Sequence, residues 1–212
     1  MGTNNDLEKR SYTFEARAET GDDGKNVIVG RPIVYEQKTD LGFFDEIIER
    51  GALNKTDLQD VRFLVNHDIS RIPLARSRRN NQNSTMQLTV DRNGMGIRVT
   101  LDTENNADAR ALYSAVERGD ISGMSFMFSV KRDEWDELES DHPTRRIKEI
   151  GTVVEVSAVT FPAYEQTEIG TRCKTALDNA RAALDSAREK RGSVDTSALE
   201  LEKLKAKYLY NV

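Results

Sequence analysis

The chain has 212 residues, of which 37% are hydrophobic and 32% are charged, and its formal net charge is -5. This length allows one domain with a sizeable core and an appendage. The acidic balance argues against a general nucleic-acid or anionic-membrane binder, so we expect neither partner. One cysteine excludes an intrachain disulfide and favours a reducing compartment over secretion. With only two histidines beside it, the ligand set for a structural zinc site is nearly empty, and we expect neither metal nor cofactor.

Most of the expected elements are strands, because apolar and polar residues alternate or β-branched residues cluster over short runs. In chain order, strands are predicted at residues 11–19, 26–35, 61–65, 85–90, 96–102, 124–130, 145–150 and 153–161. Gly30 and Pro32 interrupt the second of these, which indicates a bulge or a change of direction. Asn93-Gly94 lies between the fourth and the fifth and predicts a hairpin. An acidic loop is expected at residues 133–143.

Two helices are expected within this strand-rich region. The first spans residues 42–53 and includes Gly51 near its end, and the second spans residues 105–118 with Gly119 as a C-terminal stop. After about residue 171, leucines and alanines at helical spacing predict two more helices separated by Gly192. The predicted units are a flexible N-terminus at 1–10, a domain at 11–170 and a helical tail at 171–212. The tail either leans on a partner or packs as two ordinary terminal helices, and the pattern leaves both readings open.

Three residues, in chain order, have the side chains that hydroxyl-based catalysis requires. His67 follows the apolar strand at residues 61–65, Ser125 lies in ISGMSFMF, and Glu155 lies in VVEVSAVTFPA. A hydroxyl nucleophile needs a base to take its proton and a third group to hold that base. Because the chain has only two histidines, few bases are available.

Each of the three also has a purely structural explanation. Ser125 alternates with Phe126, so it faces away from the main apolar stripe, toward either a cleft or solvent. His67 ends a strand, either as a general base or as a turn residue whose ring bonds the backbone. Glu155 lies among valines, where an ionised carboxylate should either be paired, with a histidine N–H or with an arginine, or lie at an edge.

Two other residues, His142 and Cys173, compete for these roles. His142, in a polar loop, offers a second histidine for a Ser-His-His site in place of Glu155. Cys173 offers a thiol, and its neighbours Arg172 and Lys174 would lower the pKa of that thiol, but no base accompanies it. Asp68 is an unsuitable partner for His67, since adjacent residues on an extended chain point apart.

Taken together, these segments resemble the prohead proteases of tailed bacteriophages, the serine peptidases that mature capsids, over about residues 12–165. The resemblance rests on Asn-His-Asp at 66–68, on Gly94, on RGDISGMSFMF at 118–128 and on EVSAVTFPA at 155–163. It departs from the common pattern at Met127, where a glycine is frequent. In that family a histidine is the base, a serine the nucleophile, and an acidic residue orients the histidine, which maps these roles onto His67, Ser125 and Glu155.

The resemblance implies an α+β, mainly β fold: a small closed β-barrel surrounded by helices, like that of the herpesvirus assembly proteases. It implies a serine endopeptidase that cuts the major capsid protein and its scaffold segment, and then itself, inside the procapsid in the host cytoplasm. It admits a homodimer, and it makes the tail a docking or self-processed segment. The alternatives are a non-enzymatic head-assembly or scaffolding protein that retains the fold, and an amidase or esterase that uses the same three residues.

Overall fold

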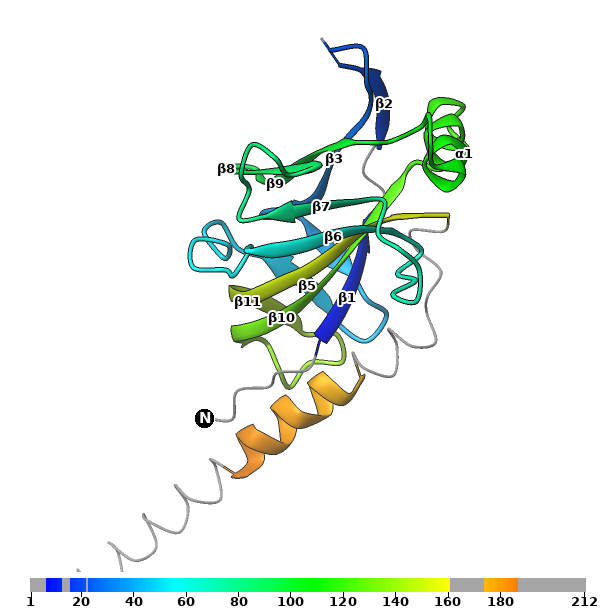
Figure 1. Ribbon diagram of the computed structural model, residues 1–212. Helices are drawn as coiled ribbons and strands as arrows, with labels where there is room; N and C mark the ends of the chain where they lie inside the picture. Colours follow the sequence, from blue (N-terminus) through cyan, green and yellow to red (C-terminus); the bar gives the residue numbers. More distant parts are fainter. Residues whose placement is uncertain (1–6, 13–15, 22, 161–173, 187–212) are drawn as a thin grey trace, which may run out of the picture.

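A computed structural model describes residues 7–12, 16–21, 23–160 and 174–186 of the chain. The described part is mixed α+β and rich in strands (Figure 1). Its strands are β1 (Leu7–Tyr12), β2 (Arg17–Thr20), β3 (Asn26–Val34), β4 (Lys38–Asp40), β5 (Asp45–Ile48), β6 (Asp60–Val65), β7 (Ala75–Arg78), β8 (Met86–Asp91), β9 (Gly94–Thr100), β10 (Gly123–Asp136) and β11 (Thr144–Val159). The helices are α1 (Ala107–Glu117) and an unlabelled one at residues 174–186.

The strands form two sheets. The larger sheet has the order β1-β10-β11-β5-β4, and β6 joins it along a different part of β11 and carries β7 on its outer side. The smaller sheet has the order β2-β3-β9-β8. The long strand β11 therefore pairs with β10 on one side, and with β5 and then β6 on the other. This arrangement places β6, β11 and β10 next to one another.

One hydrophobic core is shared by the two sheets. Side chains that are fully buried come from the larger sheet and from the smaller sheet, and they belong to a single cluster. The largest of them include Phe63, Phe126, Phe128, Ile28 and Met95. Burial of apolar surface on this scale is the main force holding the sheets together.

The expected α+β, strand-rich class is confirmed, but the closed barrel is not. Among the described strands, β7 pairs only with β6, β4 only with β5, and β8 only with β9, so hydrogen bonding ends at open edges. The alternating pattern predicts a strand with one buried face, but it carries no information on which strands pair, and closure depends on pairing.

The prediction of a helix at residues 42–53 is wrong. Residues 45–48 form β5, which pairs in parallel with β11, and turns follow. Phe44, Glu46 and Ile48 are buried while the residues between them are partly exposed, which is the two-residue period of a strand. Gly51 has a φ of 92° and lies in a turn.

Three other boundaries are corrected. Strand β10 continues to Asp136, and β11 runs unbroken from Thr144 to Val159, so the two strands expected at 145–150 and 153–161 are one. Register shifts between β10 and β11 mark bulges that let such a long ribbon bend. The loose start expected at residues 1–10 is wrong for residues 7–10, which belong to β1.

Other expectations are confirmed. The β3–β9 register shifts between Gly30 and Ile33, as the interruption of that strand indicated. The β8–β9 hairpin turns at Gly94, whose φ is 132° and where an added Cβ would lie 2.0 Å from the carbonyl oxygen of Ile33, so only glycine fits. Helix α1 begins after Asn106, whose side chain accepts from two backbone N–H groups, and Gly119 follows its end.

The helix at residues 174–186 packs on the larger sheet. Leu177 and Phe44 form a small second cluster, flanked by Leu41, Trp135 and Leu138. Arg181 donates to the carbonyl oxygens of Leu138 and Ser140. The second tail helix and Cys173 fall outside the described residues, so the expected domain division stays a prediction. Neither described helix is long and apolar enough to span a membrane.

Candidate active site

Strands β6, β11 and β10 bring the three predicted residues together. In the β10–β11 register, Ser125 lies opposite Ser157, and Met127 lies opposite Glu155. Paired residues share a face of a sheet, so Ser125, Ser157 and Glu155 project from the same side. His67 follows the end of β6, on the other side of β11. Its ring therefore has to reach across β11 to meet Ser125.

The backbone turn after β6 supplies that reach. Asn66 and His67 have φ values of 51° and 58°, in the left-handed region that non-glycine residues rarely adopt. Such a conformation costs about 1–3 kcal/mol per residue and persists only where the surroundings hold it. Here β11 holds it: the Asn66 N–H donates to the Ala158 carbonyl, and the Thr160 N–H donates to Asn66 Oδ1, at 2.9 Å each.

The three side chains are in direct contact. His67 Nε2 lies 2.6 Å from Ser125 Oγ, and His67 Nδ1 is hydrogen-bonded to Glu155 Oε1. All three residues are buried, with exposures of 6% for His67, 0% for Ser125 and 1% for Glu155. An ionised carboxylate can only accept, so Nδ1 carries the proton and Nε2 presents its lone pair to the hydroxyl. Of the two partners considered for Glu155, the structure pairs it with the histidine.

The hydroxyl of Ser125 has a second acceptor. It donates to the backbone carbonyl oxygen of Arg10 at 2.8 Å, from the neighbouring strand β1. A hydroxyl has one proton, so it can serve either Arg10 or His67 at any moment. Proton transfer to His67 therefore requires the hydroxyl to turn away from Arg10.

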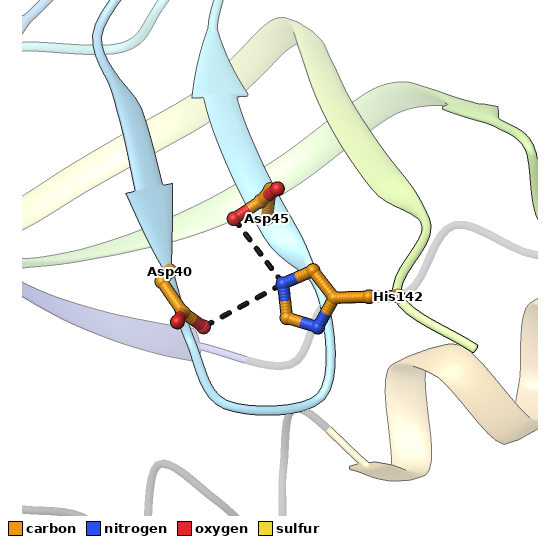
Figure 2. Close-up of side chains that lie close together, drawn as sticks. All are labelled: Asp40, Asp45 and His142. Carbon is orange, nitrogen blue, oxygen red and sulfur yellow. Dashed lines mark ion pairs between the residues drawn. The ribbon is translucent and has the colours of Figure 1, made fainter. Parts of the chain in front are cut away.

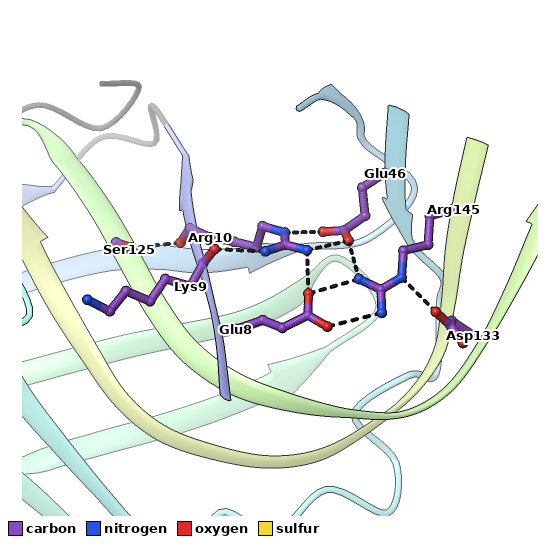
Figure 3. A network of polar contacts seen from close by, with 7 residues as sticks. All are labelled: Glu8, Lys9, Arg10, Glu46, Ser125, Asp133 and Arg145. Atoms are coloured by element: carbon purple, nitrogen blue, oxygen red, sulfur yellow. Dashed lines mark hydrogen bonds and ion pairs between the residues drawn. The ribbon is translucent and has the colours of Figure 1, made fainter. Parts of the chain in front are cut away.

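A buried ion network anchors β1 at this point (Figure 3). The Arg10 guanidinium donates to Glu46 and Glu8, and Arg145 donates to Glu8, Glu46 and Asp133. Burial raises the pKa of Glu8, but the charges of Arg10 and Arg145 outweigh it and lower the pKa from 4.5 to about 2. In the register Arg10 lies opposite Phe126, so its side chain is on the face away from Ser125. The network thus fixes the strand without entering the site.

Ser157 is a site residue that the sequence analysis missed. Its hydroxyl donates to Glu155 Oε2 at 2.6 Å and accepts from the His67 backbone N–H at 3.0 Å, and the residue is fully buried. A signal for it was present in the sequence. Ser157 follows Glu155 by two positions in a predicted strand, which places both on one face.

The competing residues lie elsewhere. His142 Nε2 is 3.2 Å from Asp45 Oδ1 and 3.6 Å from Asp40 Oδ1 in a loop cluster on the strand pair β4–β5 (Figure 2). Asp68 is directed at Ser70, to which it is hydrogen-bonded through both the backbone N–H and the hydroxyl. Neither residue shares a described contact with the site.

The His142 cluster is also the described group whose side chains come closest to a metal-ligand arrangement. One atom from each of Asp40, Asp45 and His142 lies within 4.8 Å of the others. Lys38 Nζ, however, already lies 2.5 Å from Asp45 Oδ2, and the Gly42 N–H donates to Asp40. Ion pairs and hydrogen bonds therefore account for the cluster.

An apolar cavity of about 450 Å³ borders the turn that carries His67. Leu64, Leu74, Leu112, Ala115 and Ile121 contribute apolar walls, and Asn66 and Asp68 lie at its edge. Leu64 is the register partner of Ser157, which is in turn the partner of Ser125. The cavity wall and the serine hydroxyl therefore lie on the same face of the sheet.

The chain is similar in sequence to prohead proteases of tailed phages. The family model described as caudovirus prohead serine protease matches residues 12–181. The prohead protease of Enterobacteria phage HK97 is 30% identical over 154 residues, which cover 71% of this chain. The chain spans 61% of that relative's length.

Among solved structures, the capsid assembly protease gp21 of bacteriophage T4 aligns with a TM-score of 0.46 at 12% identity, covering 74% of this chain and 98% of that one. The assignment of this chain to a family rests on the family model, because that model matches residues 12–181 of 212. This chain belongs to the caudovirus prohead serine protease family.

Proposed function

We propose that this chain is a serine endopeptidase in which Ser125 is the nucleophile, His67 the general base and Glu155 the residue that orients the base. The observation that carries the proposal is the continuous chain of contacts from Ser125 Oγ through both ring nitrogens of His67 to Glu155. Each residue meets the partner that its role requires, in a buried setting where electrostatic interactions are strong.

The chemistry follows from this geometry. His67 Nε2 takes the proton of Ser125 as the hydroxyl oxygen attacks a peptide carbonyl carbon, and the ionised Glu155 stabilises the imidazolium that forms. His67 then returns the proton to the leaving amine, which leaves an acyl group on Ser125 Oγ. Water, activated by the same histidine, releases that acyl group and restores the hydroxyl.

We infer that the substrates are the major capsid protein, its scaffold segment and this chain itself, and that cutting takes place inside the assembling procapsid in the host cytoplasm. Family membership supports this inference, as does the similarity to the HK97 relative, which is a prohead protease. The helical tail, whose first helix packs through Leu177, is proposed as the docking or self-processed segment.

We further expect a side chain of the cleaved segment to lie in the cavity beside His67. The cavity is mostly apolar, borders the turn that carries His67, and has a wall residue, Leu64, on the same sheet face as Ser125. Two isoleucines in the following loop, Ile69 and Ile72, are 77% and 85% exposed. Large apolar side chains left in solvent next to a cavity indicate a binding surface. An apolar substrate residue fits this surface best.

The test is to express the chain with the capsid protein of its phage and to follow both proteins on a gel, with Ser125→Ala in parallel. Trimming of either protein by the native chain should disappear in the variant. Ser129→Ala, a buried serine on the same strand, is the matched control and should cut normally. Equal trimming by native chain and Ser125→Ala would refute the assignment of Ser125. No trimming by the native chain would favour the non-enzymatic assembly protein instead.

A further inference from the structure

Ser157 contacts both the acid and the base of the proposed site. Its Oγ donates to Glu155 Oε2 at 2.6 Å and accepts from the backbone N–H of His67 at 3.0 Å. Its Cα is the register partner of Ser125 on β10. One fully buried residue therefore contacts the acid, holds the backbone of the base and lies across from the nucleophile.

The bond to Glu155 sets the orientation of the carboxylate. A buried carboxylate has two oxygens that need partners, and here Oε1 meets the ring of His67 while Oε2 meets Ser157. Without the second bond, the carboxylate could rotate about its terminal torsion, which has only broad minima. Ser157 thereby keeps Oε1 directed at Nδ1.

The bond to the His67 backbone holds the turn. His67 has a φ of 58°, a conformation that survives only where surrounding contacts impose it. The Ser157 hydroxyl accepts the N–H of this residue, so the start of the His67 side chain is fixed relative to β11.

Ser157 cannot replace Ser125 as nucleophile. Its proton is committed to an ionised carboxylate, which accepts more strongly than a neutral group. The nitrogen of His67 that faces a hydroxyl, Nε2, lies at Ser125. Ser125 and Ser157 lie opposite each other on β10 and β11, and it is Ser125 whose hydroxyl lies at Nε2 of His67.

We propose that Ser157 is a positioning residue of this site: it fixes the carboxylate of Glu155 and the backbone of His67 so that Nε2 faces Ser125. The inference rests on the proposed serine-protease function. It adds to the three predicted residues a fourth, which acts through its contacts with Glu155 and with the His67 backbone.

The experiment measures how fast a rhodamine-tagged fluorophosphonate, which reacts only with an activated serine, labels the full chain and its Ser157→Ala variant. Losing one buried hydrogen bond to a charged group should slow labelling by about 10- to 100-fold. Ser125→Ala should not be labelled at all, which identifies the reacting serine. Ser157→Thr, which keeps the hydroxyl, should recover most of the rate.

The control is Ser129→Ala. Ser129 is also a buried serine of the same sheet whose Oγ accepts a backbone N–H, that of Thr152 at 3.2 Å, and no carboxylate contact of it is described. Both alanine variants should lower the thermal midpoint, because both leave one N–H without its acceptor, and Ser157→Ala should lower it more, because Glu155 Oε2 also loses its donor. Only Ser157→Ala should slow labelling. Proton NMR gives a second readout: the low-field resonance of the His67 Nδ1 proton should shift or broaden in Ser157→Ala alone.

A native chain that reacts and a Ser157→Ala variant that reacts equally fast would overturn the inference and leave the proposed function intact. The same holds if Ser129→Ala slows labelling as much as Ser157→Ala does, since both effects would then be structural. A native chain that does not react would overturn the proposed function and the inference with it.

Discussion

The two histidines of the chain both lie beside carboxylates, yet their surroundings differ. His67 is 6% exposed, and its two ring nitrogens face different groups, Glu155 on one side and Ser125 on the other. The side chain of His142 is 40% exposed, and its Nε2 faces both Asp40 and Asp45. A general base needs one nitrogen held and the other free to accept a proton. The distribution of partners over the two ring nitrogens, and not the presence of a carboxylate, therefore distinguishes the candidate site from a surface ion pair.

Burial alone is not the distinguishing property either. In the network of Glu8, Arg10, Glu46 and Arg145, three of the side chains are 5% exposed or less and that of Glu8 is 17% exposed, and each carboxylate is paired with both guanidinium groups. Its paired charges anchor β1 to the sheet. The molecule thus has a buried candidate site around His67, an ion network around Glu8 that anchors β1, and an exposed cluster around His142. Substitutions can test the role of each of the three independently.

The largest effect is expected from Glu155→Gln. The amide keeps the shape but can donate to Nδ1, which favours the wrong tautomer of His67, and it removes the charge that stabilises the imidazolium. Cleavage of the capsid protein should slow by about 10³- to 10⁴-fold. Glu149→Gln, on the same strand and paired with Lys131 at the surface, is the control and should cut normally. A Glu155→Gln enzyme within about tenfold of the native rate would remove Glu155 from the site.

A smaller effect on substrate binding is expected from Ala115→Leu, which fills part of the cavity beside His67. Loss of room for an apolar side chain should raise KM for the capsid protein by about 10-fold or more, with kcat little changed. Ala107→Leu places the same side chain at an exposed position of the same helix and should leave KM unchanged. Initial rates over a range of capsid protein concentrations give both constants. An unchanged KM in Ala115→Leu would show that the substrate lies elsewhere.

The ion network around Glu8 should make the free energy of unfolding depend on pH at low pH. The folded-state pKa of Glu8 is about 2, below its ordinary 4.5, so ionised Glu8 stabilises the fold above pH 4.5 and this contribution is lost as the pH falls toward about 2. Urea unfolding at a series of pH values should show this loss in the native chain and a weaker one in Glu8→Gln. Glu117→Gln, exposed on α1, should behave like the native chain. Identical pH profiles of stability for the native chain and Glu8→Gln would contradict the stabilising role of ionised Glu8.

The smallest effect is expected from His142→Ala. Because its cluster is solvent-exposed, the free energy of unfolding should change by no more than about 0.5–1 kcal/mol. Cleavage of the capsid protein should be unaffected. A loss of activity comparable to that of Glu155→Gln would reverse the comparison of the two histidines and would point to a Ser-His-His site.

Local features of the chain could be predicted from the sequence because they depend on near neighbours. Alternation at residues 124–130 placed Ser125 on the face opposite Phe126, and the structure bears this out. The Gly94 hairpin and the helix ending before Gly119 follow from backbone preferences of single residues. The helix predicted at residues 42–53 was wrong because a short apolar run fits helix and strand alike. In the folded chain, part of this run pairs with β11 and forms strand β5.

The amino-acid sequence identifies the candidate residues: one histidine at a strand end, one serine on the strand face away from the apolar stripe and one glutamate among valines. Their meeting depends on the folded chain. Their contacts span 58 and 88 residues of chain, and they exist because β11 lies between β6 and β10. Strand pairing over such distances depends on the packing of the whole core, so the contact of Ser157 with His67 and that of the Arg10 carbonyl with Ser125 could not be read from local pattern.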